Sequence, residues 1–280
     1  CKKESTNPDP IPPVIPGVPP DNAHNLLGDP TNAQPNPVFT SNYFLDHQYW
    51  IASYSDNRGT PVWVSWHLQS EDLGNTPRQD DFRSDNLLPS GFYLVQSNSY
   101  SGSGFDRGHN CPSADRTSSI AANSSTFLMT NMIPQAPKLN QGPWEGLESF
   151  IRTSLVGTNN EAYITMGSYG YGGVAVSSVV SDINNGHVIV PSYVWKVVVV
   201  IPKGDNDISR LNNNTTVLVV NMPNNNTLYS TTSTGKNAWR DYVTTISNLE
   251  QEAASEGITL NLLKNVDPNV RAVLKNKLYQ

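Results

Sequence analysis

The run YVWKVVVVIP, residues 193–202, constrains the fold of this chain more than any other segment. It has the length of a strand, and it is apolar nearly throughout. A strand that is apolar on both faces needs cover on both faces, as the buried strands of layered sheets have. We therefore expect a central strand in a sheet that is covered on each side.

Several other segments predict further strands and helices. YWIASYS and PVWVSWHLQ are aromatic and β-branched, and the turn cluster DNRGT between them indicates a hairpin. EAYITMGS and TTVLVVNMP are also expected to be strands, as is the stretch 125–130. A helix is expected over WEGLESFIRTSLV, which ends at Gly157, and another over 237–255. Strands and helices mixed without regular alternation indicate an α+β fold with an antiparallel sheet.

Composition limits the classes of function. The 280 residues include 18 Lys and Arg and 24 Asp and Glu, which gives a formal net charge of −6. This charge argues against a broad basic face that coats DNA, but a small arginine cluster around a phosphate is compatible with it. There is no run of 18 or more apolar residues, so no transmembrane segment is expected. With only Cys1 and Cys111, the chain is not a disulfide scaffold.

The first 38 residues differ from the rest. The chain begins CKKESTNPDP, which resembles a mature bacterial lipoprotein whose N-terminal Cys1 carries a lipid anchor. The alternative is an arbitrary boundary that falls on a cysteine. Residues 6–38 include PDPIPPVIPGVPP and little that could form a core, which indicates an extended, disordered spacer. We expect one domain over 39–280, extracytoplasmic, held on the bacterial cell envelope by this lipid or secreted.

The segment FDRGHNCPSADRT, residues 105–117, combines residue types that suit phosphate chemistry. Asp106, Arg107 and His109 lie within four residues, beside Gly108, which lets the backbone turn sharply. A histidine with a near-neutral pKa can take a proton from water. Arginine binds phosphate through its planar guanidinium. A charged loop capped by an Asp turn is the alternative, and this segment alone does not decide between the two.

A second segment, TNMIPQAPKLNQGPWEGLE at 130–148, supplies oxygen ligands. Asn140 is expected just before the helix, and its side-chain oxygen is a hard neutral ligand that suits Mg²⁺. Glu148 lies on the flank of the apolar helix face, where its carboxylate could hold water of that ion. Arg152, four residues later, shares this face. The ordinary interpretations are a helix cap for Asn140 and a surface ion pair between Glu148 and Arg152.

DRGH, TN-x-x-PQ and NQG-x-W-x-x-LE occur in the order and spacing of one known family. Together they resemble the DNA/RNA non-specific endonucleases of the ββα-metal superfamily, over most of residues 43–280. The resemblance implies the ββα-metal fold, with a central antiparallel sheet flanked by helices. It also implies an endonuclease that hydrolyses DNA and RNA to 5′-phosphate products with one Mg²⁺, or with Mn²⁺ as a substitute.

The resemblance also implies roles for individual residues. His109 matches the general base that activates the attacking water, and Asn140 matches the protein ligand of the metal. Glu148 matches the residue that orders water on the metal. Arg107 matches an arginine near the scissile phosphate. In a looser alignment, Arg78 matches an upstream arginine that stabilises the phosphorane.

Three further positions follow from the same resemblance. Asn131 matches a position that supports the site, Asp106 is expected to orient neighbouring groups, and Arg152 matches a helix arginine that contacts substrate. Three alternatives stay open: a non-catalytic binder of extracellular DNA, a phosphodiesterase or nuclease of narrower specificity, and a toxin nuclease with an inhibitor partner. The intact set of His109, Asn140 and Glu148 weighs against the binder, because binding alone needs none of this chemistry.

Overall fold

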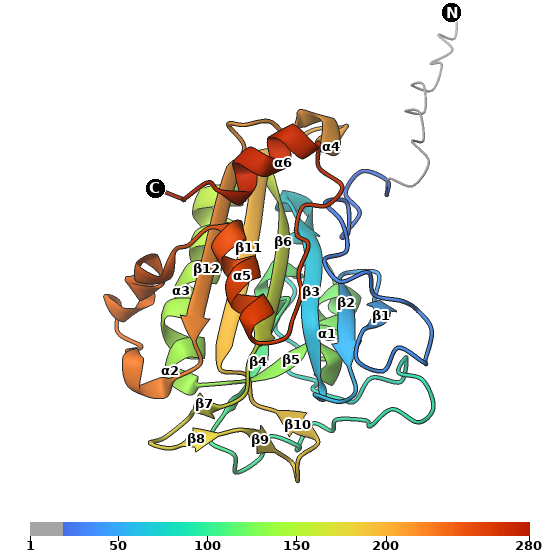
Figure 1. The fold of residues 1–280 in the computed structure, drawn as a ribbon, viewed down its shortest axis with the longest axis vertical. Helices are drawn as coiled ribbons and strands as arrows, with labels where there is room; N and C mark the ends of the chain where they lie inside the picture. Colours follow the sequence, from blue (N-terminus) through green and yellow to red (C-terminus); the bar gives the residue numbers. More distant parts are fainter. Residues whose placement is uncertain (1–18) are drawn as a thin grey trace, which may run out of the picture.

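The computed structural model describes residues 19–280. Its centre is a six-stranded sheet in the order β1-β2-β3-β6-β11-β12, in which every pairing is antiparallel (Figure 1). The strands are β1 (Tyr43–Asp46), β2 (Ile51–Ser55), β3 (Thr60–Leu68), β6 (Asn160–Tyr169), β11 (Tyr193–Pro202) and β12 (Thr216–Pro223). The expected hairpin is the β2–β3 pair. The strands predicted at EAYITMGS, YVWKVVVVIP and TTVLVVNMP are present as β6, β11 and β12.

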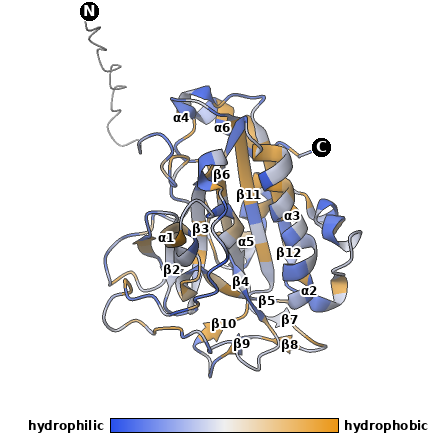
Figure 2. Ribbon diagram, turned by 180° about the vertical axis from the view of Figure 1, so that it is seen from behind, coloured by the Kyte–Doolittle hydropathy of each residue, from blue (hydrophilic) through white to orange (hydrophobic). Residues whose placement is uncertain are grey.

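Strand β11 is covered on both faces, as predicted. Val194 and Val198 pack in the core on one face, whereas Val197 and Val199 pack in the core on the other, because successive side chains of a strand alternate in direction. Helices α5 (Ile246–Ser255) and α6 (Pro268–Lys275) lie over one face (Figure 1). Figure 2, from behind, shows α1, α2, α3, β4 and β5 over the other.

The helical segment on this second face runs from Pro137 to Val156. It consists of α2 (Pro137–Leu139), a wider π-helical turn over Asn140–Trp144, α3 (Glu145–Phe150) and a second π-helical turn over Ile151–Val156. The predicted helix and its end before Gly157 are therefore confirmed. Asn140 does not precede the helix as expected: it has helical φ and ψ of −58° and −51°, and the break comes at Gly142.

The DRGH motif forms a short strand, β4 (Asp106–His109), which pairs with β5 (Met132–Gln135). The strand expected at 125–130 was wrong, because that stretch contains the end of α1 (Ile120–Ser125) and a 3-10 turn over Met129–Asn131. The expectation for Gly108 was also wrong. Gly108 lies within the strand, where an added Cβ would be 2.3 Å from Oε1 of Gln135, so close packing rather than a turn requires glycine there.

A small lobe lies below the sheet in Figure 1. Phe105 and Met132, from the two ends of the β4–β5 ribbon, are buried against Val188 and Val190 of this lobe. The lobe thus supports the ribbon from below. Its strands are β7 (Gly173–Val174), β8 (Val179–Val180), β9 (Asp182–Ile183) and β10 (Val188–Ile189).

The C-terminal part differs from its prediction as well. Residues 237–255 do not form one helix. A 3-10 helix over Gly235–Tyr242 is followed by Val243, which bridges to Val220 of β12, and α5 then begins at Ile246 after the capping residue Thr245. The short helix α4 (Asp207–Arg210) lies at the upper end of the sheet in Figure 1.

The N-terminal boundary also needs correction. Leu26 and Ala33, which fall inside the expected spacer of residues 1–38, are buried in the core between the sheet and the C-terminal helices. The packed domain therefore includes the described residues before 39. Cys1 and the lipid expected on it lie outside the described residues. Among the helices that the structure describes, none is long and apolar enough to cross a bilayer.

Candidate active site

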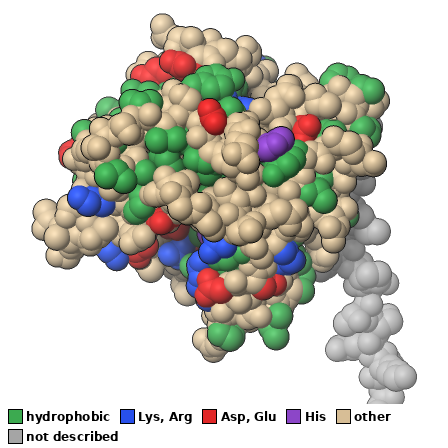
Figure 3. Space-filling view, turned by 90° about the horizontal axis from the view of Figure 1, so that it is seen from below, with side chains coloured by type: hydrophobic (Ala, Val, Ile, Leu, Met, Phe, Trp, Pro, Cys, Tyr) green, Lys and Arg blue, Asp and Glu red, His purple; other side chains and the backbone are tan. Residues whose placement is uncertain are grey.

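Two adjoining hollows, of about 460 and 410 Å³, form a cleft between β4 and the helical segment 137–156. Both are lined by Arg78, Arg107 and Asn140. The second is also lined by three more of the predicted residues, which are His109, Glu148 and Arg152. In the view from below, Lys and Arg side chains lie close to a few acidic side chains in the lower central part of the surface (Figure 3). Apart from Cys1, eight site residues were predicted, and the fold brings six of them to the second hollow.

His109 is half-buried at the end of β4, and packing sets its orientation. Its ring meets Phe82 and Phe127 edge-on, with centroid distances of 5.7 and 5.0 Å. Its Nε2 atom is buried without a hydrogen-bond partner in the described part of the chain. Burial, together with Arg78 and Arg107, lowers the pKa of His109 to about 3. The imidazole is therefore neutral at pH 7, with a pKa well below the near-neutral value expected from the sequence, because burial and the two arginines disfavour its charged form.

The same two phenyl rings also hold the arginines. The guanidinium carbon of Arg107 lies 3.7 Å from the centroid of Phe82, and that of Arg78 lies 4.8 Å from the centroid of Phe127. Asp80 pairs with Arg78 at 2.6 Å, but both side chains are at least half exposed, so this pair is weak and exchangeable. Two cations and a neutral imidazole therefore face one cleft, an arrangement that suits a phosphodiester.

Asp106 fixes the side chain of Asn140. Oδ2 of Asp106 accepts hydrogen bonds from Nδ2 of Asn140 at 2.9 Å and from Nε2 of Gln141 at 2.8 Å. A carboxylate only accepts, so it orients the nitrogen of the Asn140 amide toward itself. This bond uses Nδ2 and turns Oδ1 of Asn140 away from Asp106. A hard, neutral oxygen held in this way at a cleft fits a Mg²⁺ ligand.

Glu148 and Arg152 do not pair with each other as the ordinary interpretation proposed. Glu148 pairs with Lys196 of β11 at 3.2 Å, and Arg152 pairs with Asp115 at 2.9 Å. Burial raises the pKa of Glu148, and the positive charges of Lys196 and Arg152 oppose this shift. Neither Lys196 nor Asp115 was predicted from the sequence. Their signals were a single lysine within an apolar strand and the second Asp-Arg pair after DRGH.

Asn131 lies behind the cleft and lines neither hollow. It is fully buried, and its amide donates to the carbonyls of Cys111 and Thr126 at 2.9 and 2.8 Å and accepts from the Cys111 N–H at 2.9 Å. Its side chain thus joins the loop after His109 to the segment before β5. Cys111 is a free, buried thiol whose pKa is raised by burial.

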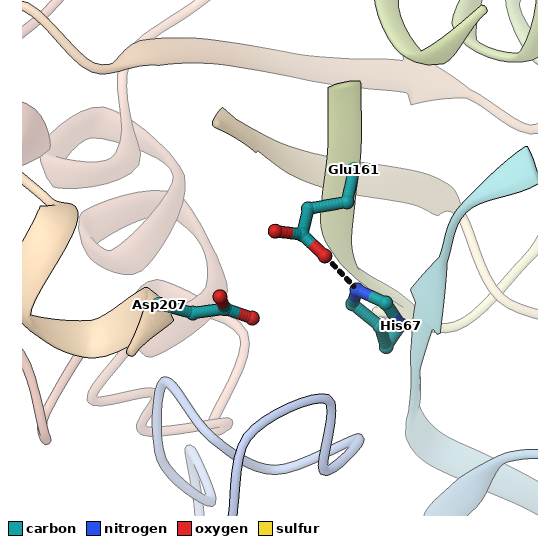
Figure 4. A group of neighbouring side chains, drawn as sticks. All are labelled: His67, Glu161 and Asp207. Carbon is teal, nitrogen blue, oxygen red and sulfur yellow. Dashed lines mark hydrogen bonds and ion pairs between the residues drawn. The ribbon is translucent and has the colours of Figure 1, made fainter. Parts of the chain in front are cut away.

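A second group of possible metal ligands, His67, Glu161 and Asp207, lies near α4 (Figure 4). Nε2 of His67 is 3.0 Å from Glu161. The guanidinium of Arg210 already bridges the carboxylates of Glu161 and Asp207, and the hydroxyl of Tyr163 donates to Asp207. These carboxylates therefore have a cation partner without a metal, and the group is explained as a buried ion-pair cluster.

The fold and the cleft together define a nuclease of the ββα-metal type. The family model for DNA/RNA non-specific endonucleases matches residues 27–269. This chain therefore belongs to the DNA/RNA non-specific endonuclease family, and it is a metal-dependent endonuclease, a hydrolase of phosphodiester bonds. The family expected from the sequence is confirmed.

Similar proteins agree with this assignment. A nuclease from a Nostoc species is 38% identical over 268 residues, which cover 96% of this chain and 90% of that protein. Human mitochondrial endonuclease G is 32% identical over 163 residues, 55% of this chain and 54% of that protein. A crystal structure of an EndoG/EndoGI complex aligns with a TM-score of 0.67 and 22% identity, over 87% of this chain and 91% of that one. The expected α+β fold of the ββα-metal type is confirmed by this last similarity.

Proposed function

We propose that this protein hydrolyses phosphodiester bonds within both DNA and RNA, with Mg²⁺ as cofactor and Mn²⁺ as a substitute, and leaves 5′-phosphate ends. The observation that carries the proposal is that His109, Asn140 and Glu148 line the same hollow as Arg78 and Arg107. Family membership supports the same class of reaction.

In this proposal, His109 acts on the attacking water, and Arg107 and Arg78 act on the phosphate. The neutral imidazole of His109 takes a proton from a water molecule as the oxygen of that water attacks phosphorus. The bond from phosphorus to the 3′ oxygen breaks, and this oxygen takes up a proton from a water molecule in the cleft to become a 3′ hydroxyl. The phosphate stays on the 5′ oxygen. Arg107 and Arg78 donate hydrogen bonds to the phosphate oxygens and stabilise the charge that grows on them in the transition state.

The metal site uses the oxygen that Asp106 leaves free on Asn140. Mg²⁺ bound there would act as a Lewis acid toward the phosphate and its leaving oxygen. Asp106 keeps the Asn140 amide turned with Oδ1 away from it, and the Glu148 carboxylate holds water in place by accepting its hydrogen bonds. These contacts reach phosphate and water, and none requires a 2′-hydroxyl or a particular base, so DNA and RNA are both substrates.

The proposal is tested with purified protein on supercoiled plasmid, single-stranded DNA and RNA, with Mg²⁺, Mn²⁺, Ca²⁺ or excess EDTA. We expect all three substrates to be cut with Mg²⁺ and with Mn²⁺, and none with EDTA. Ligase should rejoin the DNA ends without prior phosphorylation, because the ends carry 5′ phosphates. Cleavage that persists after thorough chelation contradicts the metal site, and binding without cleavage in Mg²⁺ favours a non-catalytic binder.

A further inference from the structure

Lys196 is a charged residue in the middle of an apolar face. It lies on β11 between Val194 and Val198, whose side chains belong to the core beneath α3, and its side chain is 1% exposed. An ammonium group that is buried without a partner costs several kcal/mol. A lysine at this position therefore needs a specific set of contacts to offset its burial.

Three contacts surround the ammonium group of Lys196. Nζ lies 3.2 Å from Oε1 of Glu148, and it lies 4.8 and 5.4 Å from the ring centroids of Trp144 and Trp66. The rings exclude water and attract the cation through their faces. In the described part of the chain, Glu148 is the one carboxylate within ion-pair distance of Lys196. Lys196 therefore interacts with a residue that lines the cleft.

The two members of the pair are buried to different extents. The side chain of Glu148 is 14% exposed and lines the hollow, whereas the lysine lies wholly in the core. The other charged groups near this carboxylate are Arg152 and Asp115, which pair with each other at 2.9 Å, and Glu145 one turn earlier on α3. Lys196 contacts Oε1, so Oε2 of Glu148 takes no part in this ion pair.

We propose that Lys196 is a positioning residue for the reaction: it binds Oε1 of Glu148 from the core side and so holds the carboxylate with Oε2 toward the cleft. This inference rests on the proposed hydrolysis of nucleic acid. In this proposal, β11 supplies the residue that fixes the Glu148 side chain, which α3 carries. Lys196 itself does not touch the substrate.

The test combines Lys196→Met, Glu148→Gln and the double variant in two thermodynamic cycles. The first cycle measures the free energy of unfolding in urea, and the second measures kcat and KM for cleavage of a DNA duplex in Mg²⁺. We expect Lys196→Met to lower kcat about 10- to 100-fold, the range found when a group that supports a metal site is removed, with KM within about twofold of wild type. On the Glu148→Gln background, Lys196→Met should lower kcat no further.

Two further variants make the result specific. Val198→Ala, on the same strand and the same face, should reduce stability but leave kcat unchanged, because it removes core packing without touching Glu148. Lys196→Gln can still donate to Oε1, so its kcat should lie between those of wild type and Lys196→Met. Lys196→Gln also replaces Lys196→Met in both cycles if the methionine variant does not fold.

Several outcomes would overturn the inference. It fails if the effects of Lys196→Met and Glu148→Gln on kcat multiply in the double variant, or if Lys196→Met lowers stability while kcat stays at the wild-type value. The unfolding cycle must also show coupling between the two residues, and its absence shows that the pair does not form. If the wild type itself does not cut DNA, the proposed function fails, and the unfolding cycle still reports whether Lys196 holds Glu148.

Discussion

Replacing Asp106 by asparagine removes one charge at the position that orients Asn140. The carboxylate accepts two hydrogen bonds, from Asn140 and Gln141. Hydrogen bonds to a charged group contribute about 1.5–3 kcal/mol, and those to a neutral group about 0.5–1.5 kcal/mol. Neutralisation therefore costs about 1 kcal/mol for the one bond that orients Asn140. This corresponds to a shift of about fivefold in the Mg²⁺ concentration that gives half-maximal cleavage.

The assay is a Mg²⁺ titration of the initial rate of plasmid cleavage, with calorimetric titration of Mn²⁺ as a readout of binding without turnover. Glu145→Gln is the control, because it removes one negative charge from the adjoining hollow, and the Glu145 side chain pairs with Lys236 rather than with the Asn140 side chain. We expect the metal midpoint to shift in Asp106→Asn alone. An unchanged midpoint, or an equal shift in Glu145→Gln, refutes the orienting role of Asp106.

Two predictions concern stability. Asn131→Ala should lower the free energy of unfolding in urea by about 3–5 kcal/mol, because it leaves two groups of Cys111 and the Thr126 carbonyl buried without partners; a loss below about 1 kcal/mol would show that these bonds are unimportant. Burial lowers the pKa of His24 to about 4 and also lowers that of His67 from 6.5, so the unfolded chain binds protons first. Stability should therefore fall as the pH drops from 6.5 toward 4, with a smaller fall in His24→Gln; equal slopes for both proteins in urea unfolding would contradict this.

Elements whose residue pattern lies within one segment were predicted correctly from the sequence. The apolar run at 193–202 and the helical spacing before Gly157 predicted β11 and the helix that carries Glu148. Both elements depend on periodicity and spacing within a single segment. The roles expected of His109 and Asn140 came instead from the resemblance of three motifs to a known family, and the structure shows that both side chains line one hollow.

The features that were missed depend on partners distant in the sequence. Strand β5 contains Pro134 and pairs with the DRGH segment over four residues, while the stretch 125–130 makes only an isolated bridge, between Leu128 and Arg83. Lys196 was counted as part of an apolar strand, since nothing near it in the sequence shows that Glu148 lies above it. Leu26 was assigned to a spacer because the helices that cover it come from the other end of the chain.

The central claim is that His109 is the base of a nuclease reaction, and one comparison tests it directly. The measurement is kcat/KM for DNA cleavage in Mg²⁺ by the wild type and by His109→Ala, together with the affinity of each for uncut DNA in the absence of metal. We predict a loss of about 10²- to 10⁴-fold in kcat/KM with affinity unchanged, because the general base is removed while the arginines that bind phosphate remain. Cleavage by His109→Ala at the wild-type rate would contradict the account.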